Sequence, residues 1–281
     1  MTKRTWLLSL VALACGAMVQ TTWAQITITN ELIFRDTFDV SAQSNDVNFE
    51  NNLRQSGNAA PLTYSENAPT DDLTQVGAPD APGRLRLQSN SYVSPDHNFI
   101  EGGRFTIEFD VDPGIDDTGD PLSGDWCGVV FGSSTQNPFI FSSDGLGILF
   151  RYGGNIEVWE TQAQGAIYSA SGEYPGGIPT GTNFHVRIEV DTADFSGTSA
   201  ATIKMFVNNI QVRIDNNTLE HVKASGFRNN YITLEGLGFP GPWVHVFDNL
   251  TVSAVPCIRV SPENVDKIQG QVSDPLTVTI P

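Results

Sequence analysis

The sequence predicts an all-β fold in which two antiparallel sheets pack face to face as a sandwich. Roughly a dozen short segments alternate apolar and polar residues with a period of two, the side-chain period of a half-buried strand. Clusters of Gly, Pro, Asn and Asp separate these segments as turn signals. No segment keeps a helical period over three turns. Short, evenly spaced strands without helices are typical of a sandwich.

The first 24 residues have the features of a secretory signal peptide. Lys3 and Arg4 precede a short apolar run, and Thr22 and Ala24 suit cleavage before Gln25. The apolar run is too short for a membrane anchor. A lipoprotein signal ending at Cys15 remains an alternative. No later segment is apolar enough to cross a membrane, so we expect a secreted or cell-surface protein.

Within the N-terminal half, strict alternation marks residues 104–112, which end at Pro113-Gly114. Residues 145–151 and 155–159 are expected to form a hairpin over Gly153-Gly154. Polar or Gly/Pro-rich stretches at residues 41–58, 68–83, 91–98 and 116–125 read as loops. The expected strands of this half are residues 32–39, 61–64, 84–88, 104–112, 126–131, 145–151 and 155–159.

The C-terminal half shows the same pattern. Residues 201–207 and 211–214 predict a hairpin over Asn208-Asn209, and residues 172–181 form a Gly/Pro loop. The closing strand, residues 243–254, is the longest. The expected strands of this half are residues 166–168, 184–191, 201–207, 211–214, 231–235 and 243–254.

The opening and closing strands each carry a carboxylate on the face expected to be apolar. Asp36 shares a face with Leu32, Phe34 and Phe38. In the closing strand, alternation places Asp248 on the face of Val244, Val246, Leu250 and Val252, opposite His245, Asn249 and Thr251. A bare carboxylate among apolar side chains is costly, so each of these two requires a compensating partner.

The composition beyond the closing strand changes. Residues 255–281 resemble the first strands of a second, Ig-like β module, or a C-terminal tail that packs back onto the sandwich, and are too few to bury a core alone. We therefore expect one domain over residues 25–254. Export permits a disulfide between Cys127 and Cys257, but the sequence leaves their pairing open.

The chain is acidic, with a net charge of −17 from 32 acidic and 15 basic residues. Such a chain is a poor partner for nucleic acid or anionic lipid. It is compatible with neutral glycans and divalent cations, and equally with simple solubility.

Four motifs, in their order, resemble the concanavalin A-like lectin/glucanase superfamily in its laminin-G-like bacterial form. They are Phe34-Arg-Asp-Thr-Phe38, Phe105-Thr-Ile-Glu-Phe-Asp-Val111, Phe184-His-Val-Arg-Ile-Glu-Val-Asp191 followed by Met205-Phe-Val-Asn-Asn209, and Val246-Phe-Asp-Asn-Leu-Thr-Val252. The resemblance implies a jelly roll whose first and last strands are neighbours. It also implies frequent carbohydrate binding, a structural calcium ion in some members, and glycanase activity in others.

The glycanase alternative requires paired carboxylates on one face. Retaining enzymes of the superfamily carry Glu-x-Asp-x-x-Glu, and the nearest matches here are Glu189-Val-Asp-Thr-Ala-Asp194 and Glu108-Phe-Asp-Val-Asp112. The first has Asp194 in place of the second Glu, and the second stops at Pro113. We interpret both as solvent faces of ordinary strands, and name no catalytic residue.

Aromatic residues beside Gly/Pro loops are the expected sugar-stacking groups. Tyr174 and Trp243 have this position, and His245 follows Trp243 on the closing strand. Packing in the core is the commoner fate of such rings in a sandwich. The four histidines are scattered, and the sequence contains no serine-nucleophile or zinc-protease motif.

A calcium ion shared by Asp36 and Asp248 is the expected compensation for the two carboxylates. Calcium accepts six to eight oxygens, including carboxylates and backbone carbonyls from adjoining loops. An arginine partner and the backbone amides of a loop are the alternatives, although Arg35, the arginine nearest in sequence, points to the opposite face of its own strand.

Three functions therefore remain open from sequence. The first is a secreted, non-catalytic carbohydrate-binding or adhesion module whose partner is a polysaccharide or cell-surface glycan. The second is a structural cell-surface domain without a small ligand. The third is a carbohydrate-active enzyme.

Overall fold

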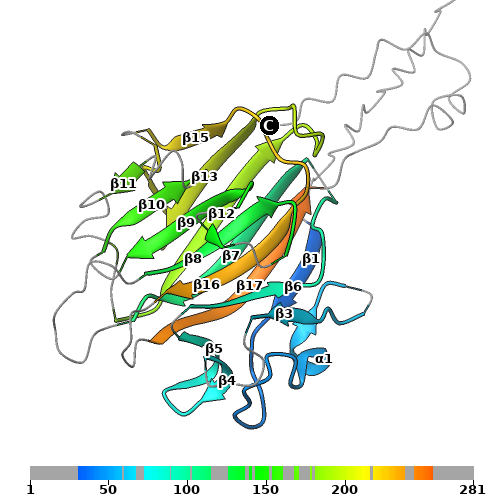
Figure 1. Cartoon of the computed structure of the whole chain (residues 1–281), viewed down its shortest axis with the longest axis vertical. Helices are drawn as coiled ribbons and strands as arrows, with labels where there is room; N and C mark the ends of the chain where they lie inside the picture. The colour runs from blue at the N-terminus through cyan, green and yellow to red at the C-terminus, as the bar shows by residue number, and fades with distance from the viewer. Residues whose placement is uncertain are drawn as a thin grey trace, which may run out of the picture.

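The computed structural model of the chain is a jelly-roll sandwich of two antiparallel sheets (Figure 1). The strands of both sheets run along roughly the same diagonal of the view. The structure describes residues 31–58, 60–67, 73–88, 90–101, 103–114, 126–136, 139–140, 143–151, 154–160, 168–170, 178, 181–215, 218–237 and 244–255. The expected signal peptide, the segment after residue 255, Cys257, Tyr174 and Trp243 lie outside these residues.

The larger sheet has the central order β14-β13-β12-β7-β17-β1-β2, and β15, β5 and β4 extend it. The first and last strands pair directly, with Phe34 opposite Val252, which confirms the prediction that they are neighbours. The strands of the larger sheet are β1 (Glu31–Asp36), β2 (Gln55–Ser56), β4 (Thr74–Ala78), β5 (Ala81–Gln88), β7 (Arg104–Asp112), β12 (Phe184–Thr192), β13 (Ala201–Val207), β14 (Ile210–Val212), β15 (Glu220–Lys223) and β17 (Val244–Val255).

The smaller sheet has the order β11-β10-β9-β8-β16-β6-β3. A single four-residue helix, α1 (Asn51–Arg54), is the helical element of the described residues. The strands of this sheet are β3 (Tyr64–Glu66), β6 (Ser91–Pro95), β8 (Trp126–Ser133), β9 (Leu146–Arg151), β10 (Ile156–Trp159), β11 (Tyr168–Ala170) and β16 (Tyr231–Leu237).

Alternation along the strands builds the core between the sheets. On β7, Phe105 and Phe109 point inward and are at most 2% exposed, while Glu108 points outward. Phe105 meets Phe131 of β8 at 6.4 Å between ring centroids, and Phe109 meets Phe150 of β9 at 6.0 Å. These edge-on aromatic contacts join the two sheets across their centres.

The closing strand departs from the predicted alternation at a β-bulge. Asn249 has φ 52°, and the pairing of β17 with β7 shifts between Asp248 and Thr251. Phe247 before the bulge and Leu250 after it both face the core. Because one extra residue moves the preceding side chains to the other face, the prediction that Asp248 shares the core face with Leu250 is wrong.

Three short strands, β2, β4 and β6, lie in segments expected to be loops, and β15 lies in a stretch for which no strand was predicted. Each is five residues or shorter and is held mainly by a longer partner, as β4 is by β5. Tertiary pairing therefore decides these strands more than local composition does. No helix among the described residues is long and apolar enough to span a membrane.

Candidate functional site

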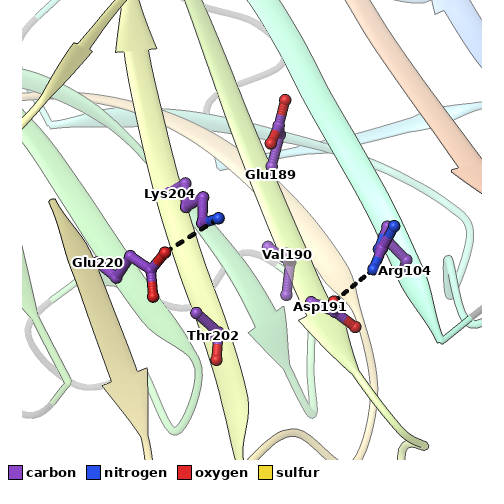
Figure 2. Close-up of a pocket in the computed structure, with 7 residues that line it drawn as sticks. All are labelled: Arg104, Glu189, Val190, Asp191, Thr202, Lys204 and Glu220. Carbon is purple, nitrogen blue, oxygen red and sulfur yellow. Dashed lines mark hydrogen bonds and ion pairs between the residues drawn. The ribbon is translucent and has the colours of Figure 1, made fainter. Parts of the chain in front are cut away.

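A polar groove of about 360 Å³ lies on the outer face of the larger sheet (Figure 2). It runs across β7, β12, β13 and β15, whose alternate residues point away from the core and into the groove. Its lining residues are Arg104, Glu189, Val190, Asp191, Thr202, Lys204 and Glu220.

Two ion pairs border this groove on opposite sides. Figure 2 shows Arg104 paired with Asp191 at 2.7 Å, and Lys204 paired with Glu220 at 2.9 Å. The Glu220 hydrogen bond raises the pKa of Lys204, which stays charged. All four side chains are at least 40% exposed. Because exposed ion pairs contribute little to stability, these charges remain available to a ligand.

Glu189 extends the polar surface from the centre of β12. Its carboxylate accepts a hydrogen bond from Arg187 at 2.5 Å, and the Arg187 guanidinium stacks on the Phe206 ring at 4.1 Å from the centroid. The stacking holds Arg187 in a fixed orientation. The groove therefore presents anchored donors and acceptors from neighbouring strands.

The third acid of the glycanase-like motif does not join the groove. Asp194 lies in the turn after β12, where it accepts hydrogen bonds from the Ser196 amide at 2.9 Å and the Ser199 hydroxyl at 3.0 Å. These bonds, first those of Ser196, lower the pKa of Asp194. Glu189 and Asp191 share the outer face, but each has an arginine as its partner.

A second acidic group lies further along the same face. His185 contacts Asp110 through Nδ1 at 2.9 Å and Glu108 through Nε2 at 3.2 Å. Asp248 stands opposite Asp110 on β17. Burial, and then the like charges of Asp110 and Asp39, raise the pKa of Asp248 to about 6.

The surroundings of Asp36 do not fit a calcium ion shared with Asp248. Asp36 is fully buried and accepts hydrogen bonds from the Phe38 amide at 2.7 Å, Arg54 Nε at 3.0 Å, the Tyr64 hydroxyl at 2.8 Å and Gln55 Nε2 at 3.2 Å. The Arg54 guanidinium already balances its charge. Asp248 lies on the opposite face of the sheet. Across the described ranges, no three His, Cys, Asp or Glu side chains are grouped to hold a metal.

His245 is placed away from either outer face. It is 1% exposed, and its ring nitrogens contact the carbonyl oxygens of Pro113 at 2.6 Å and Leu237 at 3.3 Å. The bulge at Asn249 accounts for this inward position, because Phe247 and His245 share a face before it. This burial does not support the expected ligand contact of His245. Ligand contacts of Tyr174 and Trp243 stay predictions.

The outer face of the smaller sheet carries an apolar cluster that sequence reasoning missed. Trp126, Val130, Leu149 and Ile140 pack together there, apart from the main core. Gly147 makes room for Ile140, because a Cβ on Gly147 would lie 2.1 Å from Ile140 Cγ1. The alternation of β16 places Glu235 on this face, but sequence gives no sign that Ile140 covers it.

No protein-family model matches the chain, and no curated protein matches it in sequence. Among solved structures, it is similar to the carbohydrate recognition domain of Emp47p, with 11% identity over 69% of this chain and 88% of that chain, at a TM-score of 0.43. It is also similar to the exoplasmic/lumenal domain of VIP36 in its Ca²⁺/Man3GlcNAc-bound form, with 9% identity over 73% of this chain and 89% of that chain, at a TM-score of 0.43. A third similar structure is the alginate lyase Aly36B, with 14% identity over 69% of this chain and 88% of that chain, at a TM-score of 0.39.

Proposed function

We propose that this protein is a secreted, non-catalytic carbohydrate-binding module whose partner is a polysaccharide or a cell-surface glycan. The module corresponds to residues 25–254 after removal of the leader. The observation that carries the proposal is the groove between the Arg104–Asp191 and Lys204–Glu220 pairs.

The size and chemistry of the groove suit a sugar. Its volume of about 360 Å³ falls within the range of small-ligand sites, roughly 300–1,000 Å³. A saccharide presents hydroxyls that both donate and accept hydrogen bonds. Carboxylates accept from such hydroxyls, and the Arg104 and Lys204 side chains donate to them. Bonds that involve a charged partner are roughly twice as strong as neutral ones.

The open face of the sheet favours binding to a chain over catalysis. A hydrolase of the paired-acid type requires one carboxyl group that keeps its proton. In this groove Glu189 and Asp191 each accept a hydrogen bond from an arginine, so both carboxylates are engaged as acceptors rather than as donors. The alternative function is a glycoside hydrolase, because both carboxylates lie in one groove. Release of reducing ends that disappears in Glu189→Gln would establish that alternative.

Binding by the chain from Gln25 onward to a glycan array, followed by calorimetry on the best glycan, tests the proposal. We expect Asp191→Asn and Lys204→Met each to weaken affinity by at least about tenfold, the value of one charged hydrogen bond. The matched control is Asp80→Asn, which removes an exposed carboxylate paired with Arg86 outside the groove. Absence of binding to every glycan, or equal affinity in all three variants, would contradict the proposal.

A further inference from the structure

A narrow crevice opens on the outer face of the smaller sheet, on the side of the molecule away from the groove. Tyr92 of β6, Trp126 of β8, Phe139 and Glu235 of β16 line it, together with Asn90, Ser91 and Gly236. Its volume is about 20 Å³. A space of this size accommodates one water-sized group, such as a single hydroxyl.

Glu235 is the polar side chain at the base of the crevice. It is 1% exposed, and its Oε2 accepts a hydrogen bond from the Ile140 amide at 3.0 Å. Within the described part of the chain, no group makes a hydrogen bond to Oε1. A buried polar atom without a partner lowers the stability of the fold, because it has given up its hydrogen bonds to water. The fold therefore holds Glu235 at an energetic cost that a ligand could remove.

The protonation of this carboxyl decides which ligand group suits it. Burial raises the pKa of Glu235 to about 8, against the opposing hydrogen bond from Ile140. Tyr92 is the other titratable side chain on the crevice wall, and no charged side chain among the described lining residues faces Glu235. At neutral pH the acid is therefore uncharged. Oε2 accepts from Ile140, which leaves Oε1 to carry the proton toward the crevice.

We propose that the Glu235 crevice is a second ligand site for a neutral saccharide. One hydroxyl of the sugar enters the crevice and accepts a hydrogen bond from Glu235 Oε1. The ligand class rests on the proposed function, whereas the site is separate from the groove. The sugar ring lies over Phe139, which is 39% exposed and tilted against Trp126 at 6.3 Å between centroids. Aromatic faces of this kind cover the apolar side of a sugar.

The cost of desolvation favours a hydroxyl over an ammonium group. Moving a hydroxyl into an apolar crevice has a desolvation cost that one hydrogen bond can offset. An unpaired ammonium costs far more, and it would also require Glu235 to give up its proton. A neutral sugar is therefore preferred to an amino sugar. A bound sugar also shuts water out of the crevice, which costs an ionised Glu235 more than a protonated one, so we expect its affinity to fall as Glu235 ionises.

Calorimetry from pH 6 to 9.5 tests the site in an Asp191→Asn, Lys204→Met background, in which the groove is impaired. The probes are neutral tetrasaccharides of glucose, mannose and galactose, with the glucosamine tetrasaccharide as the cationic probe. We expect a neutral probe to bind and to lose at least fivefold in affinity above pH 8. Glu235→Gln, which keeps a donor and the Ile140 contact, should bind without this pH dependence. Glu235→Leu should lose binding.

The second site would be overturned by tighter binding of the glucosamine probe, by an affinity for the neutral probes that does not change with pH, or by full binding by Glu235→Leu. Loss of all binding in the groove-impaired background, with binding by the unmodified chain, would reject this site and leave the groove intact as the proposed function. Thermal melts confirm that each variant folds, and Glu157→Gln on the same face serves as the control for a changed acid.

Discussion

Asp248 and Asp110 stand directly opposite each other on β17 and β7, with their carboxylates on the outer face of the larger sheet. The position results from the bulge at Asn249. The pKa of Asp248 rises to about 6 because of burial and the nearby carboxylates. A folded-state pKa above the ordinary value of 3.8 means that ionisation of Asp248 costs stability as pH rises from about 4 to about 6.

Asp248→Asn should therefore stabilise the protein at pH 7. We expect a gain of about 1 kcal/mol, less than the full pKa shift implies because the Asp248 side chain is partly exposed to solvent. At pH 3.5, Asp248 is mostly protonated in both the folded and the unfolded protein, so the substitution should have little effect. Urea unfolding at the two pH values measures the difference, and a loss of stability at pH 7 would contradict it.

A structural calcium ion at Asp36 and Asp248 stays a prediction from the sequence, and the geometry opposes it. Because Arg54 neutralises Asp36 and Asp248 lies on the other face, we expect equal melting temperatures in calcium and in EDTA. An ion bound by the folded state alone would add about 2.7 kcal/mol at a hundredfold excess over Kd. A rise of several degrees in calcium that Asp248→Asn abolishes would restore the calcium site.

The buried Asp36–Arg54 pair should be among the most sensitive positions in the fold. Arg54→Met leaves a buried carboxylate without its cation and should cost about 3–5 kcal/mol. It also removes donors to the Val47 and Phe49 carbonyls. Arg104→Met, at an exposed pair, should cost at most about 1 kcal/mol. Urea unfolding compares the two, and equal losses would show that burial does not govern the pair.

His221 should make stability depend on pH. Its ring is 3% exposed and contacts Glu160 at 2.8 Å and Asp215 at 3.0 Å, with Lys223 also near Glu160 at 3.7 Å. Burial opposes the charged form, but the two carboxylates outweigh it and raise the pKa of His221 above 6.5. The stabilisation is complete below pH 6.5 and is lost as pH rises through the folded pKa.

Unfolding from pH 5.5 to 9 measures this loss, which has a slope of at most about 1.4 kcal/mol per pH unit. Glu235 gives a loss of the same sign between about pH 4.5 and 8, because its folded pKa is also raised. The comparison is therefore made in the Glu235→Gln background, with and without His221→Gln. A slope that His221→Gln leaves unchanged would contradict the prediction.

Gly147→Ala should displace Ile140 from the outer face of the smaller sheet. The new Cβ would lie 2.1 Å from Ile140 Cγ1, and overpacking of this kind costs about 1–3 kcal/mol. Ile140→Ala removes the clashing atoms, so the double variant should be more stable than the sum of the two single losses predicts. Strict additivity in chemical unfolding would show that Ile140 does not occupy this space.

The strand pattern was predictable from sequence because most strands alternate without interruption. Residues 104–112 and 201–207 match β7 and β13 at both ends. The faces of β17 were not predictable, because a bulge depends on a positive φ at Asn249 that alternation does not signal. The partner of Asp36 was not predictable either. Arg54 lies in a segment read as loop, and only tertiary folding brings it to β1.

The groove was predictable in part. Glu189 and Asp191 were recognised as one face of a strand, but Arg104, the partner of Asp191, comes from β7, and Lys204 and Glu220 come from β13 and β15. Strand order across a sheet is a long-range property that a single sequence does not reveal. The crevice at Glu235 depends on Phe139 and Ile140, which fold back over the sheet.

The pairing of Glu31 with Ala254 places the two ends of the domain beside each other. A polypeptide that enters at β1 and leaves at β17 therefore does so at one edge of the molecule. Tension between the flanking segments would pull these antiparallel strands apart from their shared end, one hydrogen bond after another. Such a domain resists pulling weakly, so under load it would lengthen at a lower force than a domain whose terminal strands are loaded in shear.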